Sequence, residues 1–148
     1  MKFPFLKNST EFIDRGIYFS KKNNFTEAIL CFDKVLETDA NSTVAWLHKG
    51  LALKELGRNE EAIAVFDKVL EMESNNSSAL YNKGLVLGNL GRNEEATLCI
   101  DKSIETKYNN SLNLYAEGND LKRCGKYDEA LSFYTKALES NPNNVDAL

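Results

Sequence analysis

Residues 46–66 read WLHKGLALKELGRNEEAIAVF, and this stretch recurs in altered form at a fixed distance along the chain. Its glycine, Gly50, has counterparts 34 residues apart: Gly16, Gly84 and Gly118. Its alanine, Ala62, keeps the same step: Ala28, Ala96 and Ala130. A fixed period of about 20–50 residues indicates an array in which each unit is one supersecondary module that buries its apolar face against its neighbours.

Large apolar side chains keep the same period. One column stands four residues before the glycine: Phe12, Trp46, Leu80 and Leu114. Another stands four residues after the alanine: Phe32, Phe66, Ile100 and Tyr134. Because a spacing of four keeps side chains on one face of an α-helix, these columns predict helices with a repeated apolar face.

Turn and cap signals divide each unit into two helices. The first helix is expected to end at a residue that tolerates positive φ, in the column Gly57, Gly91 and Gly125. The second helix begins with acids such as Glu60 and Glu61, which suit the positive end of the helix dipole. Polar connectors such as 75–77 and 141–144 then offer turn formers and N-caps. The pattern predicts helix, turn, helix, turn throughout.

With these columns the chain resembles the tetratricopeptide repeat family, whose members stack 34-residue helical hairpins. The last unit carries the fullest set of signature residues: Leu114, Gly118, Leu121, Gly125, Tyr127, Ala130, Tyr134, Ala137 and Pro142. The first unit departs from the pattern with Asn23 in place of a glycine, and the third with Ile100 and Ser103 in place of an aromatic residue and an alanine. The resemblance implies an all-α fold, a right-handed superhelical solenoid of antiparallel helix-turn-helix repeats.

Alignment on the glycines gives the predicted domain organisation. Residues 1–8 form an N-terminal extension, and residues 9–144 form four units: 9–42, 43–76, 77–110 and 111–144. Residues 145–148 align with the start of a further unit, so they are expected to begin a truncated fifth repeat or a capping helix.

Composition and charge exclude several classes of protein. The formal net charge of −4 argues against nucleic acid as a partner, because phosphate-binding surfaces need clustered Lys and Arg. No run of about 18 apolar residues is present, so no membrane span is expected. The first seven residues are too short in apolar length for a signal peptide, so a cytoplasmic location is expected.

No constellation of catalytic, metal-binding or cofactor-binding residues stands out. The cysteines, Cys31, Cys99 and Cys124, are odd in number and lack metal spacing. His48 is the one histidine, so a histidine-based metal cluster cannot form within one chain. The chain is therefore expected to be non-catalytic and to work without a cofactor or metal.

The resemblance also implies a binding surface, because the first helix of each hairpin lines the concave side in this family. The positions carried over are Ile13, Ile17, Leu47, Leu51, Tyr81, Asn82, Leu85, Tyr115, Asn119, Lys122 and Arg123. A mostly apolar strip with polar sides predicts a groove for a peptide or protein segment, with Tyr81 and Tyr115 as anchors. Part of this lining could instead pack against neighbouring helices.

Three alternatives accompany this prediction. Some relatives grip a terminal carboxylate with Lys and Asn of the first repeat, but Ile13 and Ile17 at those places cannot donate hydrogen bonds, which argues against that mode. The second helix of the last unit, with Leu131, Tyr134 and Leu138, lacks a covering helix, so the chain could be a self-association module that forms a homo-oligomer. It could also be the regulatory repeat region of a larger protein.

Overall fold

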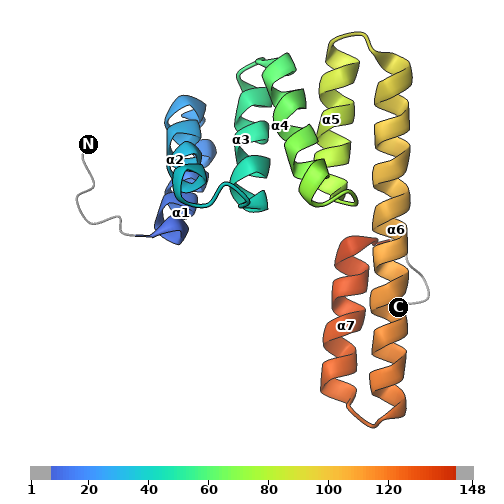
Figure 1. Cartoon of the computed structure of the whole chain (residues 1–148). Helices are drawn as coiled ribbons and strands as arrows, with labels where there is room; N and C mark the ends of the chain where they lie inside the picture. Colours follow the sequence, from blue (N-terminus) through green and yellow to red (C-terminus); the bar gives the residue numbers. More distant parts are fainter. Residues whose placement is uncertain (1–7, 143–148) are drawn as a thin grey trace. The chain divides into compact units, whose positions relative to one another are not determined.

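The computed structural model describes residues 8–142, and every regular element in that range is an α-helix. The helices are α1 (Ser9–Lys21), α2 (Phe25–Thr38), α3 (Thr43–Glu55), α4 (Asn59–Met72), α5 (Ser77–Asn89), α6 (Asn93–Arg123) and α7 (Tyr127–Ser140) (Figure 1). The predicted all-α class is confirmed. Apart from Asn8, the predicted N-terminal extension lies outside the described residues, as does the predicted start of a fifth unit at 145–148.

Side-chain caps and left-handed residues set the ends of most helices. Asn8 and Asn24 accept hydrogen bonds from the backbone N–H of Glu11 and Glu27, at the starts of α1 and α2. The turn after the first helix of each hairpin has positive φ: 59° at Asn23, 73° at Gly57, 77° at Gly91 and 76° at Gly125. Asparagine tolerates this conformation better than most residues, so the first hairpin keeps the turn without a glycine.

The chain divides into two compact units, and the boundary between Ile100 and Asp101 lies inside α6. Unit 1 therefore contains α1 to α5 and the first part of α6. Unit 2 contains the rest of α6 and α7.

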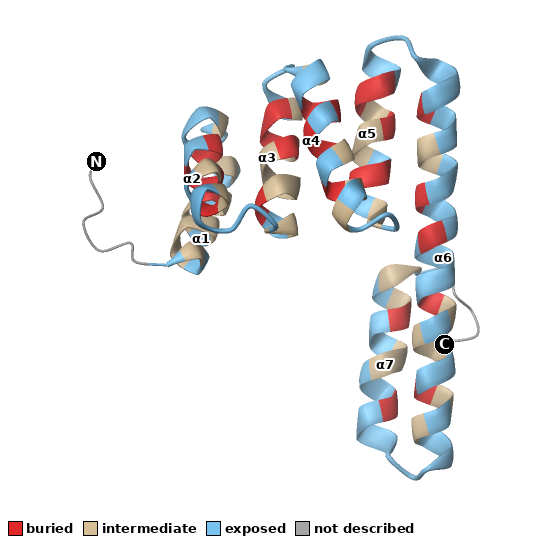
Figure 2. Ribbon diagram, viewed as in Figure 1, coloured by how far each residue is buried: buried red, intermediate tan, exposed pale blue. Residues whose placement is uncertain are grey.

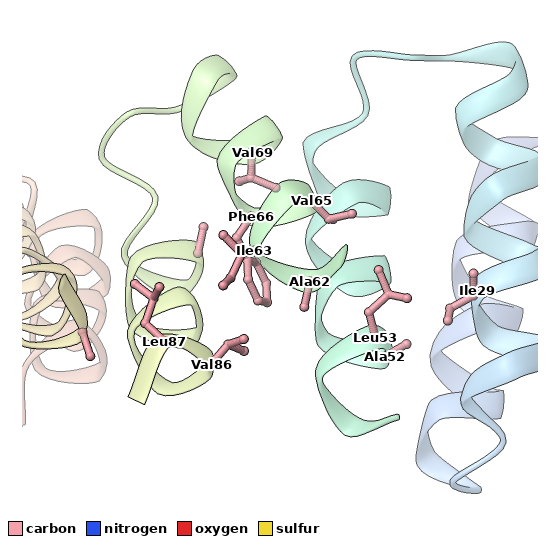
Figure 3. Packing of buried hydrophobic residues seen from close by; sticks show 12 residues of the cluster. Ile29, Ala52, Leu53, Ala62, Ile63, Val65, Phe66, Val69, Val86 and Leu87 are labelled. Atoms are coloured by element: carbon pink, nitrogen blue, oxygen red, sulfur yellow. The ribbon is translucent and has the colours of Figure 1, made fainter. Parts of the chain in front are cut away.

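Unit 1 is held together by large apolar side chains that lie between successive helices. Its main core cluster draws on α2 to α6 and centres on Phe66, which is fully buried together with Val69 and Val86 (Figure 3). A second cluster surrounds Phe32, between α1, α2 and α3. Helix α3 packs against α2, and α5 packs against α4, so each hairpin covers the apolar face of the one before it.

Ion pairs join successive hairpins of unit 1 beside this core. Lys49 Nζ on α3 lies 2.7 Å from Asp33 Oδ1 on α2. One repeat later, Lys83 Nζ on α5 lies 2.6 Å from Asp67 Oδ1 on α4. The lysine side chains are about one-fifth exposed, so these two pairs are less open to solvent than the i,i+3 ion pairs of the described residues, in which both side chains are more than 40% exposed.

The repeated glycine lets the two helices of a hairpin approach closely. A Cβ atom at Gly50 would lie 2.6 Å from Cε1 of Phe66, and one at Gly118 would lie 2.6 Å from Cε1 of Tyr134. Neither distance leaves room for a methyl group without moving a core ring. The residues of the glycine column therefore lie against the large side chains of the column that follows 16 residues later.

Unit 2 buries much smaller side chains than unit 1. Among the described residues of this unit, the side chains with at most 2% exposure are Ser103, Ser111, Ala130 and Ala137. Ser111 Oγ donates a hydrogen bond of 2.9 Å to the carbonyl oxygen of Ala137, which ties α6 to α7. Figure 2 shows long exposed stretches on α7, where only Ala130 and Ala137 are buried.

The turn predicted between the third and fourth units, near residues 107–110, is wrong, because α6 is continuous from Asn93 to Arg123. In the first connector the backbone N–H of Asn41 donates to Asp39 Oδ1, and in the second the side chain of Asn76 donates to Glu73 Oε2. The third connector has Lys107 at this position, and a lysine side chain has no acceptor to hold such a turn.

Candidate functional site

The first helices of unit 1 form a shared surface. Helix α3 contacts both α1 and α5, so the three helices lie next to one another. The predicted groove residues of this unit are Ile13 and Ile17 on α1, Leu47 and Leu51 on α3, and Tyr81, Asn82 and Leu85 on α5. We call this set the inner face of unit 1. All seven are half-buried except Tyr81, which is 44% exposed.

Part of the inner face also belongs to the core. Ile13 and Ile17 pack against the cluster around Phe32, and Leu47 and Leu51 pack against the main cluster. The half of each side chain that does not face the core stays open to solvent. The inner face is therefore an apolar surface on a rigid base, with Tyr81 as its most exposed large side chain.

The polar residue of the inner face, Asn82, and the neighbouring Lys54 already have hydrogen-bond or ionic partners. Lys54 Nζ on α3 donates a 2.8 Å hydrogen bond to Asn82 Oδ1 on α5, and Asn82 Nδ2 donates to the carbonyl oxygen of Ser78 at 2.8 Å. Glu55 lies 3.7 Å from the same lysine. Glu55 balances the charge of Lys54, and both the oxygen and the nitrogen of the Asn82 amide are hydrogen-bonded. The surface at Lys54 and Asn82 is therefore close to neutral.

His48 lies on α3 next to Leu47 and stacks on Phe32, with ring centroids 5.5 Å apart and an interplanar angle of 21°. Burial lowers the pKa of this imidazole below its ordinary value. The neutral form is therefore favoured in the folded protein.

Unit 2 carries the other four predicted groove residues. Tyr115 lies against Tyr134, with ring centroids 5.8 Å apart, and the Tyr134 hydroxyl donates a 2.7 Å hydrogen bond to Asn119 Oδ1. Asn119, Lys122 and Arg123 line a hollow of about 350 Å³ together with Tyr127. Sequence reasoning placed Tyr127 among the signature residues of the family but missed it as a lining residue. The column it shares with Phe25, Asn59 and Asn93 carries no common chemistry.

The structure thus assigns the predicted groove residues to two surfaces. The aliphatic residues, Tyr81 and Asn82 lie on the inner face of unit 1, and Tyr115, Asn119, Lys122 and Arg123 lie in unit 2. The two surfaces differ in chemistry as well, because the first is apolar and the second is rich in hydrogen-bond donors.

Residues 8–142 contain no group of three or more His, Cys, Asp or Glu side chains that could hold a metal ion. The three cysteines are unpaired by disulfides, and burial raises the pKa of the Cys31 thiol, which disfavours the reactive thiolate. Within the same described range, no helix is long and apolar enough to cross a membrane.

Comparison with protein families identifies the repeats. Models described as tetratricopeptide repeat match residues 77–110 and 111–144, and a model described as TPR repeat matches residues 50–91. The chain belongs to the tetratricopeptide repeat family. A search of curated proteins gives no significant match.

Solved structures with the same fold include several repeat proteins. MamA from Desulfovibrio magneticus RS-1 is 20% identical with a TM-score of 0.64, over 93% of this chain and 78% of that one. The second TPR of Spaghetti (RPAP3), bound to an HSP90 peptide, is 20% identical with a TM-score of 0.65, over 68% and 93%. YrrB, described as a TPR protein with an unusual peptide-binding site, is 26% identical with a TM-score of 0.62, over 95% and 72%.

Proposed function

We propose that the chain is a non-catalytic scaffold that binds a peptide or protein segment on the first helices of its hairpins. The observation that carries this proposal is the inner face of unit 1, where Tyr81 stands exposed beside half-buried aliphatic side chains. Apolar surface with a polar edge is typical of interaction sites, and exposed tyrosines are frequent binding hot spots. The neutral edge at Lys54 and Asn82 suits an uncharged apolar segment.

Rigidity supports the same function. The inner-face side chains rest on fully buried residues such as Phe32 and Phe66, so little backbone or side-chain entropy should be lost on binding. YrrB, which is described as having a peptide-binding site, adds support from a protein of the same fold. An extended segment and a helix both fit a surface of this kind.

The test is peptide binding by single and double variants. A phage-displayed library of apolar peptides is selected on the full chain, and the affinity of the selected peptide is measured by fluorescence anisotropy. We expect Tyr81→Ala to weaken binding by at least about tenfold, equivalent to about 1.4 kcal/mol, because a hot-spot anchor is lost. Adding Tyr115→Ala shows whether unit 2 contributes.

The matched control is Tyr108→Ala, which removes a tyrosine of similar exposure, 50%, from α6 outside the inner face. Circular dichroism should show unchanged helicity for all variants. Equal loss of binding in Tyr108→Ala and Tyr81→Ala would contradict the proposed site, and so would unchanged binding in the Tyr81→Ala and Tyr115→Ala double variant.

Self-association is a second candidate, favoured by a hollow of about 890 Å³ on the first hairpin. Its lining includes Phe12, Tyr18, Phe19 and Leu30, and Tyr18 and Leu30 are each 54% exposed. Light scattering coupled to size-exclusion chromatography over a wide concentration range distinguishes the two candidates. A dimer or larger species that Leu30→Ser dissociates would favour assembly, whereas a monomer at every concentration would favour the peptide scaffold.

A further inference from the structure

We propose that the protein assembles head to tail, with α1 of one copy packed on α6 of a second copy. This inference rests on the self-association candidate above and deepens it, because it names both contact surfaces. The surface of α1 that carries Phe12, Arg15 and Tyr18 is called the head. The surface of α6 that carries Asp101 and Ile104 is called the tail. Because the two surfaces differ, the contact is heterologous and can be repeated from copy to copy.

The junctions inside unit 1 show how such a contact is built. Lys49 on α3 forms an ion pair with Asp33 on α2. Lys83 on α5 repeats this pair with Asp67 on α4. Both pairs lie beside the apolar clusters that join successive hairpins. The first helix of a hairpin therefore packs on the second helix of the hairpin before it through a lysine–aspartate pair and an apolar contact.

The tail keeps the acidic half of this junction. Asp101 is in the column of Asp33 and Asp67. Those two aspartates are half-buried beside their lysines, whereas Asp101 is exposed and has no ion pair within residues 8–142. The fourth hairpin cannot supply the cation in the same register, because Glu117 is in its lysine column. An acid thus stands without a cation in a column that elsewhere pairs with one.

An apolar residue of the tail is open in the same way. Ile104 is 61% exposed, whereas its counterparts Leu36 and Leu70 are half-buried. A hollow of about 480 Å³ lies beside Asp101 and Ile104, and its lining also includes Lys107 and Pro142. The tail is therefore an apolar and acidic surface that is more exposed than the equivalent surfaces of the first two hairpins.

The head carries the complementary half of the junction. Arg15 is in the column of the two paired lysines, so it places a cation where the internal junctions use one. Phe12, Arg15 and Tyr18 line the hollow of about 890 Å³ on the first hairpin, and Tyr18 is 54% exposed. A copy docked in the register of the internal junctions would bring Arg15 to Asp101 and apolar rings to Ile104. Charge and apolar surface therefore match together.

The start of α1 also differs from the internal junctions in a way that suits the tail. The indole N–H of Trp46, which is in the column of Phe12, donates a 2.8 Å hydrogen bond to the carbonyl oxygen of Ala40 in the connector after α2. In a docked copy Phe12 would thus lie at the hollow of the tail. Glu11 replaces the buried alanines of the next two hairpins, and Lys107 replaces the acids of the first two connectors. This adds a second match of opposite charges.

The experiment measures the assembly of the full chain by sedimentation velocity at low salt over a wide range of concentrations. We expect the mass of the wild type to rise with concentration. Arg15→Glu on the head and Ile104→Glu on the tail should each weaken self-association by at least about tenfold, because the first opposes Asp101 with a like charge and the second buries a charge in the apolar contact. High salt should weaken assembly of the wild type, because it screens the pair of Arg15 and Asp101.

Mixing the two variants tests the polarity of the contact. The Arg15→Glu copy keeps an intact tail, and the Ile104→Glu copy keeps an intact head. An equimolar mixture should therefore form a one-to-one heterodimer, which native mass spectrometry detects. Growth should stop at two chains, because the remaining head and tail both carry an introduced glutamate. A mixture that stays monomeric would contradict a head-to-tail contact.

Two controls separate the contact from general electrostatics. Lys21→Glu makes the same change of charge as Arg15→Glu at an exposed position of α1 outside the head. Leu98→Glu places a charge on an exposed apolar position of α6, in a column where Ala64 stays exposed although α5 packs on α4. Both should leave self-association within about twofold of the wild type. Circular dichroism should show unchanged helicity in all variants.

A wild type that stays monomeric at every concentration would overturn the proposal, as would equal weakening by the controls. Dissociation by Leu131→Glu but not by Ile104→Glu would assign the contact to α7 and would also contradict it. Oligomers that neither head nor tail variant dissociates would refute this contact and leave self-association through another surface. Peptide binding to the inner face, measured on the monomeric variants, tests the scaffold function separately, because Tyr81 lies on α5 and outside the head and tail.

Discussion

The first helices of the second and third hairpins bury a face that the first helix of the fourth hairpin leaves in solvent. In α3 and α5 this face carries Ala45 and Ala79, which have no exposed surface. The equivalent residue of the fourth hairpin is Asn113, which is exposed. Seven residues later, Ala52 and Val86 are buried in unit 1.

The fourth hairpin differs at this second position too, because it carries Asp120, whose side chain is 72% exposed. Between Asn113 and Asp120 lies Glu117. The equivalent residues of the second and third hairpins are Lys49 and Lys83, which form ion pairs with Asp33 and Asp67. If the fourth hairpin stacked in the same register, Glu117 would face Asp101, and two like charges would oppose the contact. Three substitutions on one helical face therefore disfavour stacking.

The first hairpin also carries charged residues on this face. Glu11, Arg15 and Tyr18 occupy its same three columns. In these columns the fourth hairpin therefore resembles the first hairpin more than the second and third. This comparison also explains Asp120, a carboxylate in a column that is otherwise apolar, because a solvated carboxylate carries no desolvation penalty.

The largest expected effect comes from truncating the aromatic ring that lies against a repeated glycine. In unit 1 this ring is Phe66, against Gly50, and in unit 2 it is Tyr134, against Gly118. Phe66→Ala should lower the free energy of unfolding by about 3–5 kcal/mol, because Phe66 is fully buried between hairpins. Tyr134→Ala should cost less, because Tyr134 is only half-buried. Urea titrations followed by circular dichroism measure both, and an equal or larger loss in Tyr134→Ala would contradict the difference between the units.

A second prediction concerns the three positions of the fourth hairpin that differ from the buried face of α3. The triple variant is Asn113→Ala, Glu117→Lys and Asp120→Ala. These changes give the fourth hairpin the face of the second and should stabilise unit 2 by roughly 1–2 kcal/mol. Hydrogen exchange should then show loss of protection near residues 107–110, where a turn would replace the continuous helix. Asn109→Ala with Glu139→Lys is the control for altered composition. Unchanged protection in the triple variant would mean that Lys107 and its neighbours, not the face, keep α6 continuous.

The ion pairs between hairpins should have a smaller effect. Lys83→Met removes the contact with Asp67 and should destabilise unit 1 by about 0.2–1 kcal/mol, because the aspartate is half-exposed and solvent screens the pair. The loss should shrink in high salt. Lys102→Met serves as the control because Lys102 has no ion pair within the described residues. A loss in the control as large as in Lys83→Met would show that the bridge adds nothing specific.

The smallest expected effect is a pH dependence confined to unit 1. The folded-state pKa of His48 is lowered by burial, so the unfolded chain binds a proton more readily than the folded protein. The contribution of His48 to stability is therefore complete above the ordinary imidazole pKa of about 6.5 and is lost as pH falls through the lower folded value. Thermal unfolding from pH 7.5 to 5.5 should show a shallower decline for His48→Phe than for the wild type, and identical slopes would contradict this account.

Much of the molecule could be predicted because its signals are local. The positive φ of Asn23 occurs where a glycine column had a single exception, and the glycine contacts with Phe66 and Tyr134 follow from two columns 16 residues apart. The inner-face residues of unit 1 lie on α1, α3 and α5, the helices that the resemblance to the family implied, and their role in binding stays a prediction.

The hollow lined by Asn119, Lys122, Arg123 and Tyr127 was only partly predictable. Lys122, Arg123 and Asn119 were predicted as groove residues, but the orientation of the Asn119 amide depends on the Tyr134 hydroxyl, which comes from another helix. No spacing along the sequence reports which end of an amide is already hydrogen-bonded. Tyr127 was missed for a related reason, because its place in the lining depends on how α7 leaves the turn.

By itself, the sequence determined the 34-residue period, the helical hairpins and the residues that fill each hairpin, because these depend on contacts between residues close in the chain. Only the tertiary structure decided that α6 is continuous from Asn93 to Arg123 and that Asn113, Glu117 and Asp120 are exposed. The physical reason is that a helix face is buried only where a neighbouring hairpin offers a complementary surface. The equivalent positions in unit 1 hold buried alanines and lysines paired with aspartates, and that role could be seen only in the structure.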